Sequence, residues 1–211
     1  MHPDSHSGQR IGPFAGRIHP DWNHTAFLAW VHGLEGHVAA PGGRVLTAGR
    51  NRNVVLDAPG PDGPRAVVVK CFARPSLYGR WRARRMGSKA RRTWQAADAL
   101  ARRGVGTPPP IGFLEAWDGT RLRRAFFLSE YCAGAVTFKD ALIDLFERHP
   151  ECEAFMQLLE LVAGAVRKMH DGGVQHNDLG NQNLLLNPAG TAAWEHVRFI
   201  DLNRARVRGG P

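Results

Sequence analysis

The residues best suited to chemistry lie close together near the end of the chain. Residues 176–183 read His-Asn-Asp-Leu-Gly-Asn-Gln-Asn, and residues 199–201 read Phe-Ile-Asp. Asp178 and Asn183 are five positions apart, and Asp201 follows 18 positions after Asn183. An aspartate can orient a hydroxyl and take its proton, and oxygen donors in this order can hold magnesium beside phosphates. The spacing therefore predicts phosphoryl-transfer chemistry.

A short hairpin would bring the second and third of these residues together. Residues 184–186 and 197–200 are short apolar runs, and the loop composition Asn-Pro-Ala-Gly-Thr separates them. In an antiparallel pair, Asn183 and Asp201 lie at the same end of neighbouring strands, roughly 4.8 Å apart. The alternative is that each only caps a strand end or turn, as Asn and Asp often do. The ordered triplet with Asp178 favours a site.

Phosphoryl transfer also needs a basic residue that contacts the nucleotide phosphates, and Lys70, which precedes the three oxygen donors in the sequence, is the candidate. It lies near the end of a predicted strand over 65–72, next to Val67-Val68-Val69. Burying an ammonium group is costly unless an anion compensates it, and a nucleotide phosphate would do so. The alternative is that the side chain extends from the strand end into water. Gly49 and Asn51 form the turn before this region and could cover phosphates with backbone and amide groups, although an ordinary hairpin turn has the same composition.

The periodicity predicts an α+β chain in which strands come first and helices later. Residues 1–24 are polar and are expected to form a loose or extended arm. Residues 25–131 are expected to form a β-rich lobe, and residues 132–211 a helical lobe that ends in the hairpin. Within these lobes, the predicted strands cover 44–47, 53–57, 65–72, 111–116 and 124–131, and the helical patterns cover 88–103 and 155–169.

Charge and cysteine content limit the partners and the compartment. The 211 residues carry a net charge of +9 with a pI near 10.5, which favours an anionic partner. Residues 73–92 are strongly basic, and they are interpreted as a solvated face or as contact with an anionic membrane or glycolipid. No nucleic-acid motif is recognisable. Three cysteines without CxxC spacing argue against a disulfide framework and a zinc site, so a reducing cytoplasm is expected.

Several segments together resemble one family. Val67-Val-Val-Lys70 is similar to a kinase lysine strand, and Leu128-Ser-Glu-Tyr131 resembles the hinge that holds adenine. Residues 87–111 resemble the first helix and its Gly-x-x-Thr-Pro turn, and residues 176–183 match a catalytic loop. Phe-Ile-Asp-Leu-Asn-Arg over 199–204 is similar to a replacement for the usual Asp-Phe-Gly. The chain thus resembles the bacterial lipopolysaccharide core kinases, the Kdo/heptose kinase family with a protein-kinase-like fold.

The resemblance implies a two-lobed kinase fold that uses ATP and Mg²⁺. Asp178 would be the catalytic base, and Asn183 and Asp201 would be the metal ligands. Lys70 would bind ATP phosphates, and the hinge at Glu130 and Tyr131 would hold adenine. The acceptor would be a sugar hydroxyl of the lipopolysaccharide inner core. The expected location is cytoplasmic, with peripheral contact at the inner face of the plasma membrane as an option. No nucleic-acid partner is expected.

Two departures from the family pattern keep alternatives open. No glutamate stands where kinases pair the strand lysine, and Asp98 is the nearest acid on that helix. The chain also ends ten residues after Asp201 (211 − 201), so the helical lobe is expected to be shortened at its C-terminus. The alternatives are a kinase that acts on protein serine or threonine, and a non-catalytic nucleotide-binding protein. The sequence does not assign the acceptor sugar or the oligomeric state.

Overall fold

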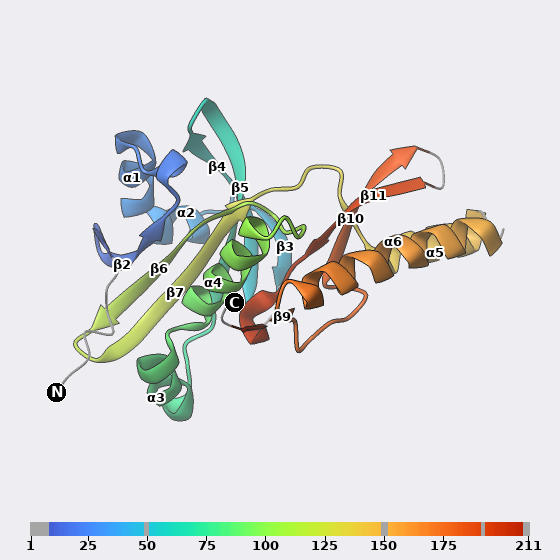
Figure 1. Cartoon of the computed structure of the whole chain (residues 1–211). Coiled ribbons are helices and arrows are strands. Elements are labelled where there is room, and N and C mark those ends of the chain that lie inside the picture. Colours follow the sequence, from blue (N-terminus) through green and yellow to red (C-terminus); the bar gives the residue numbers. More distant parts are fainter. Residues whose placement is uncertain (1–8, 49–50, 149–151, 191–192, 209–211) are drawn as a thin grey trace. The chain divides into compact units, whose positions relative to one another are not determined.

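The computed structural model describes residues 9–48, 51–148, 152–190 and 193–208, and it divides into two compact units (Figure 1). Unit 1 comprises Met1–Trp94 and Pro110–Tyr131, and unit 2 comprises Gln95–Pro109 and Cys132–Pro211. Strands dominate unit 1 and helices are longest in unit 2, in agreement with the predicted α+β class. The segment Gln95–Pro109 packs with unit 2, whereas the sequence placed it in the first lobe.

Unit 1 is built on a seven-stranded antiparallel sheet with the order β1-β2-β6-β7-β5-β4-β3. The order follows from hairpins, since β4 pairs with β5 and β6 pairs with β7, and β5 then pairs with β7. The strands are β1 (Gln9–Ile11), β2 (Phe14–Ile18), β3 (Arg44–Ala48), β4 (Arg52–Gly60), β5 (Gly63–Phe72), β6 (Pro110–Asp118) and β7 (Arg121–Glu130).

The N-terminal segment is the main departure from the predicted elements. Residues 9–18 form β1 and β2 instead of a loose arm, and β2 pairs with β6 so that Ala15 lies opposite Glu115. Alternate side chains, including Phe14 and Ile18, are buried by this pairing. The partner strand lies about a hundred positions later in the sequence. The local composition of residues 9–18 gives no signal of this pairing, and the segment was therefore predicted to be a loose arm.

Helices cover both faces of the sheet in unit 1. On one face, three short helices pack their apolar side chains against alternate residues of the strands and form a core. These helices are η1 (Pro20–Trp22), α1 (Thr25–His32) and α2 (Leu34–Ala39). On the other face, α3 (Leu77–Met86) and the start of α4 (Lys89–Arg102) pack against Phe72, Phe113 and Leu122. The buried Glu115 carboxylate accepts hydrogen bonds from Ser88 N at 3.3 Å and Trp117 Nε1 at 3.1 Å, and so fixes the entry to α4.

The main elements of unit 2 are the helices α5 and α6 and two small antiparallel sheets. The helices are α5 (Phe138–Arg148) and α6 (Cys152–Asp171), and one sheet has the order β11-β10-β8, with β8 (Val136–Thr137), β10 (Leu184–Gly190) and β11 (Ala193–Phe199). The other pairs β12 (Arg206–Val207) with β9 (Val174–Gln175). Thr137 caps the start of α5, because its Oγ1 accepts from Asp140 N at 3.1 Å and donates to the Asp140 carboxylate at 2.7 Å.

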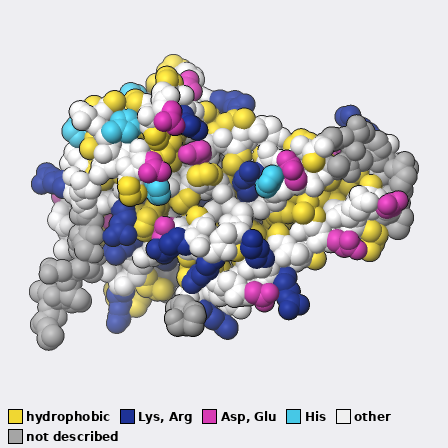
Figure 2. Space-filling model, turned by 45° about the horizontal axis from the view of Figure 1, so that its top comes forward, with side chains coloured by type: hydrophobic (Ala, Val, Ile, Leu, Met, Phe, Trp, Pro, Cys, Tyr) yellow, Lys and Arg dark blue, Asp and Glu magenta, His cyan; other side chains and the backbone are white. Residues whose placement is uncertain are grey.

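Apolar side chains remain exposed on these two helices. Ile143 and Phe146 on α5 and Met156 and Leu159 on α6 are between 45% and 75% exposed. Yellow side chains are visible at the surface in this part of the molecule in Figure 2. In the described part of the chain, no helix is both long and apolar enough to cross a membrane.

Candidate active site

The predicted hairpin is present and brings Asn183 next to the segment that holds Asp201. β10 and β11 pair antiparallel with Leu184 opposite Phe199. Ile200 N also donates to Asn183 O at 3.0 Å, which extends the pairing to the residue before Asp201. Two short apolar runs that flank a loop form a hairpin because each strand buries one row of side chains. The hydrogen bonds between the strands then pair the backbone N–H and C=O groups.

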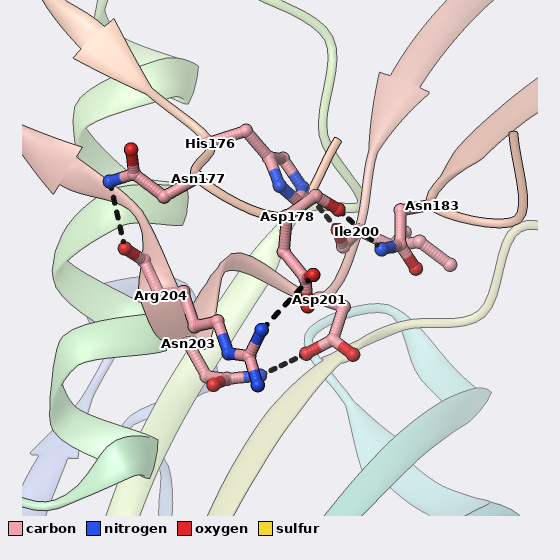
Figure 3. Close-up of polar contacts among 8 residues, drawn as sticks. All are labelled: His176, Asn177, Asp178, Asn183, Ile200, Asp201, Asn203 and Arg204. Carbon is pink, nitrogen blue, oxygen red and sulfur yellow. Dashed lines mark hydrogen bonds and ion pairs between the residues drawn. The ribbon is translucent and has the colours of Figure 1, made fainter. Parts of the chain in front are cut away.

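The segment before the hairpin forms an open loop around Asp178. Residues Asn177–Asn183 line a hollow of about 390 Å³. Asn183 Nδ2 donates to the Asp178 backbone oxygen at 2.8 Å, so the loop closes on itself across five positions (Figure 3). This bond engages the amide nitrogen of Asn183, and the amide oxygen is the atom of this side chain that a hard cation would prefer.

His176 braces the loop that carries Asp178. Its side chain is 2% exposed, and Nε2 lies 2.7 Å from Ile200 O. A carbonyl oxygen can only accept, so Nε2 carries the proton of this hydrogen bond. The histidine therefore ties the loop of Asp178 to the segment of Asp201.

Arg204 is the functional candidate that sequence reasoning missed. Its Nη1 lies 3.2 Å from Asp178 Oδ1, and Asn177 Nδ2 donates to its backbone oxygen at 3.2 Å. Asn203 Nδ2 in turn donates to Asp201 Oδ1. Figure 3 shows these contacts, which link both carboxylates to η2 (Leu202–Arg204). The only sequence signal was the place of this arginine in the segment 199–204.

The backbone is strained at two of these positions. Asn177 has φ 58° and Asp201 has φ 59°, in the left-handed region that non-glycine residues seldom occupy. His196 is the only other non-glycine residue with positive φ among the described residues. Strain of this kind persists where surrounding contacts hold it, and it gathers at functional sites. Here the two strained residues lie on the two segments that carry Asp178 and Asp201.

A loop that precedes β6 supports the hairpin from within unit 2. Gly106 O accepts from Phe199 N at 2.9 Å, and Thr107 Oγ1 donates to Phe199 O at 3.0 Å. A Cβ on Gly106 would lie 1.9 Å from Val197 O, so only glycine fits against this strand. The segment that ends in Asp201 is therefore held on both sides.

The nucleotide residues predicted from the sequence lie in unit 1. Lys70 is half-buried on β5, and its Nζ lies 5.6 Å from the centroid of the Phe72 ring. Opposite it in the ladder are Asn53 and Phe127. Asp98, the acid considered as a partner for Lys70, forms an ion pair with Arg102 at 2.8 Å within α4.

The other predicted nucleotide residues surround the ends of β5 and β7. Asn51 Oδ1 accepts from Ala73 N at 3.3 Å, so its oxygen fixes the strand end. Tyr131 N donates to Ala66 O at 3.0 Å, and the Arg44 guanidinium lies 4.7 Å from the centroid of the Tyr131 ring. Glu130 lies opposite Val67 in the ladder. Gly49 lies outside the described residues.

Comparison with known proteins identifies the family. The lipopolysaccharide kinase (Kdo/WaaP) family matches residues 77–210, well over half of the chain. The chain belongs to this family. The resemblance drawn from the sequence is thereby confirmed.

The similar proteins are lipopolysaccharide core kinases. The core heptose(I) kinase WaaP of Escherichia coli K12 is 31% identical over 121 residues, which cover 56% of this chain and 46% of that protein. The WaaP of Pseudomonas aeruginosa PAO1 is also 31% identical over 121 residues, which cover 56% of this chain and 45% of that protein. The matched regions thus span about half the length of these relatives.

A solved structure confirms the fold. The chain matches a structure described as WaaP in complex with acyl carrier protein, with a TM-score of 0.62 and 27% identity. The match covers 92% of this chain and 73% of that chain. The α+β, protein-kinase-like class predicted from the sequence is therefore correct, with a β-rich first part and a second part that carries the catalytic-type loop.

Proposed function

We propose that this protein transfers the γ-phosphate of ATP to a sugar hydroxyl of the lipopolysaccharide inner core. The observation that carries the proposal is the cluster in unit 2, where Asp178 and Asn183 share one loop and Asp201 follows the paired strand. Membership of the lipopolysaccharide kinase family supports the reaction class. The heptose kinases among the relatives support a sugar acceptor.

In this proposal Asp178 is the catalytic base. Its carboxylate is 40% exposed beside the hollow, so an acceptor hydroxyl can reach it. As the hydroxyl oxygen attacks the γ-phosphorus, its proton passes to the Asp178 carboxylate and ADP leaves with the bridging oxygen. Asp178 thus removes the charge that would otherwise build up on the attacking oxygen.

Arg204 acts as a positioning residue for this base. It contacts Asp178 Oδ1 at 3.2 Å, and its own backbone is held by Asn177. A carboxylate with one oxygen occupied by a guanidinium keeps the other oxygen oriented toward solvent and acceptor. The proposed geometry therefore depends on an ion pair between two separate segments of unit 2.

The residues present fit a magnesium site of the phosphate-sharing type. Asn183 offers its amide oxygen and Asp201 a carboxylate, and magnesium commonly takes one or two such ligands with phosphates and water. Asn183 and Asp201 would hold the ion, which supplies positive charge beside the phosphates. Lys70, Gly49, Asn51 and the hinge residues Glu130 and Tyr131 would hold ATP.

A transfer assay with labelled ATP tests the acceptor. Lipopolysaccharide core oligosaccharide is expected to become labelled in a magnesium-dependent reaction, while a generic protein substrate stays unlabelled. Label on protein serine or threonine alone would contradict the sugar acceptor. Stabilisation by ATP without label on any acceptor would indicate a non-catalytic nucleotide-binding protein and overturn the proposed reaction.

A further inference from the structure

The helix α3 and its flanks form a basic surface that the proposed phosphate transfer does not use. Residues 73–92 contain eight Lys and Arg residues and no Asp or Glu. Ten residues of this stretch form α3, where Ser76 Oγ caps the start by accepting from Gly79 N at 3.2 Å. The helix is therefore a defined element with a single sign of charge.

One side of α3 is attached to unit 1. Ala83 is 6% exposed and belongs to the cluster with Leu122 and Ala125. Arg84 Nε donates to Thr120 O at 3.0 Å and so ties the helix to the β6–β7 turn. These contacts fix which residues of α3 point outward.

The outward side combines aromatic and cationic groups. At 3.6 residues per turn, Trp81 and Arg85 lie about 160° from Ala83 around the helix. Trp81 is 52% exposed, and the Arg85 guanidinium lies 5.3 Å from the centroid of its ring. An exposed tryptophan and a nearby guanidinium are therefore held together on the outward side of a helix that carries no acid.

We propose that α3 is an interfacial helix that docks the protein on an anionic phospholipid bilayer. Tryptophan is favoured at the level of the headgroups, where its ring is partly dehydrated and its N–H can still form a hydrogen bond. Arginines near an anionic surface each add to the attraction. Trp81 enters the headgroup region, and Arg85 contacts lipid phosphates.

This inference deepens the proposed function, because a lipopolysaccharide acceptor is anchored in a membrane. Docking through α3 would keep the enzyme at the surface where its acceptor lies. The binding itself requires no ATP and no turnover. An Asp178→Asn variant that fails to transfer phosphate is therefore expected to bind vesicles like the wild-type protein, so failures of the two proposals can be told apart.

Sedimentation with phospholipid vesicles tests the docking surface. The wild-type protein should bind vesicles of phosphatidylglycerol and phosphatidylcholine, bind pure phosphatidylcholine far less, and lose affinity as salt rises. Arg85→Glu should weaken binding roughly tenfold or more, since one cation is lost and one anion gained near the surface. Trp81→Ala should weaken it several-fold.

Matched controls are available on unit 2. Arg167→Glu makes the same change of charge at a side chain that is 82% exposed, and Phe146→Ala removes an aromatic ring from a residue that is 75% exposed. Both controls should bind vesicles like the wild-type protein, and all four variants should keep its melting temperature.

Two results would overturn the proposal. One is equal weakening by Arg85→Glu and Arg167→Glu, because binding would then follow net charge and not α3. The other is wild-type binding to single-stranded DNA or to an acidic protein that depends on Trp81 and Arg85 while anionic vesicles are not bound. In that case the basic face would serve a different partner.

Discussion

Arg204 lies 26 positions after Asp178 in the chain, and its guanidinium contacts the Asp178 carboxylate in the proposed site. The two side chains are 64% and 40% exposed, so the pair adds little to folding stability. The role that we propose for it is to orient the Asp178 carboxylate. That distinction makes the role of Arg204 open to test.

Arg204→Ala is expected to lower kcat for phosphate transfer by roughly ten- to a hundredfold, because a misplaced base loses its alignment with the acceptor. The KM for ATP and the melting temperature should stay near wild type. Arg204→Lys should restore part of the rate by keeping the charge. Steady-state kinetics with both substrates measure these values.

The control for this prediction is Arg167→Ala. Arg167 also forms an exposed ion pair at 3.2 Å, with Asp171 at the end of α6. Its removal should leave kcat unchanged. An equal loss of rate in both variants would show that Arg204 has no special role in positioning Asp178.

Cys71 offers a residue-scale test of the packing in unit 1. Burial raises the pKa of the Cys71 thiol from an ordinary value of 9.0 to about 11, although Arg52 and Arg124 lower it in part. The thiolate is the reactive form, so alkylation at neutral pH should be slower at Cys71 than at the cysteine of a short unstructured peptide. Mass spectrometry of iodoacetamide-labelled peptides measures both rates.

The same pKa shift gives a direction for stability. The folded state favours the neutral thiol of Cys71, so its contribution to stability is complete below pH 9 and is lost as pH rises toward 11. Cys71→Ser should remove this part of the alkaline decline. Labelling of Cys71 as fast as the cysteine of an unstructured peptide at neutral pH would contradict the described burial.

The hairpin of β10 and β11 places Asn183 and Asp201 at the same end of its two strands. Gly106 supports this hairpin, because its backbone oxygen accepts from Phe199 N. Gly106→Ala places a Cβ 1.9 Å from Val197 O, so β11 must move. We expect a loss of about 1–3 kcal/mol in the free energy of unfolding, as for other overpacked sites. Phosphate transfer should fall as well, because β11 leads directly to Asp201.

Gly164→Ala is the matched control for this change. Gly164 lies inside α6, and an added Cβ there meets nothing within 4 Å. Alanine should leave the free energy of unfolding unchanged or raise it by up to about 1 kcal/mol, since it favours helix more than glycine. Urea unfolding of both variants decides the matter. Similar stabilities would contradict the close approach of Gly106 to β11.

Prediction from the sequence succeeded where local pattern determines structure. The valines of β5, the helical spacing of α6 and the two short runs of the hairpin each carry their own signal. It failed for β1 and β2, whose burial depends on β6 far along the chain. It also missed Arg204, because no local rule pairs an arginine with an aspartate 26 positions earlier. The hairpin that brings Asn183 beside the segment of Asp201 was predictable, whereas the contacts of Arg204 with Asp178 and of Asn203 with Asp201 required tertiary structure. The chemical roles of Asp178, Asn183 and Asp201 stay predictions.

At the scale of the whole molecule, the proposed function requires unit 1 to bind ATP. Magnesium and ATP should raise the melting temperature, since a ligand at a hundred times its Kd adds about 2.7 kcal/mol of stability. That corresponds to several degrees for a protein of this size. Lys70→Ala should greatly reduce the shift, because Lys70 is the proposed phosphate contact.

The control is Lys168→Ala, which removes an exposed lysine from α6. It should keep the full thermal shift with ATP and magnesium. If Lys70→Ala also keeps the full shift, Lys70 does not contact the nucleotide, and the assignment of the strand lysine must be abandoned.

The most direct test of the central claim is the rate of labelled phosphate transfer to lipopolysaccharide core oligosaccharide by the wild-type protein and by Asp178→Asn. The substitution keeps the size of the side chain and removes the base. We predict magnesium-dependent transfer by the wild-type protein and a loss of at least about a hundredfold in the variant, at an unchanged melting temperature. Transfer by Asp178→Asn at the wild-type rate would contradict the account.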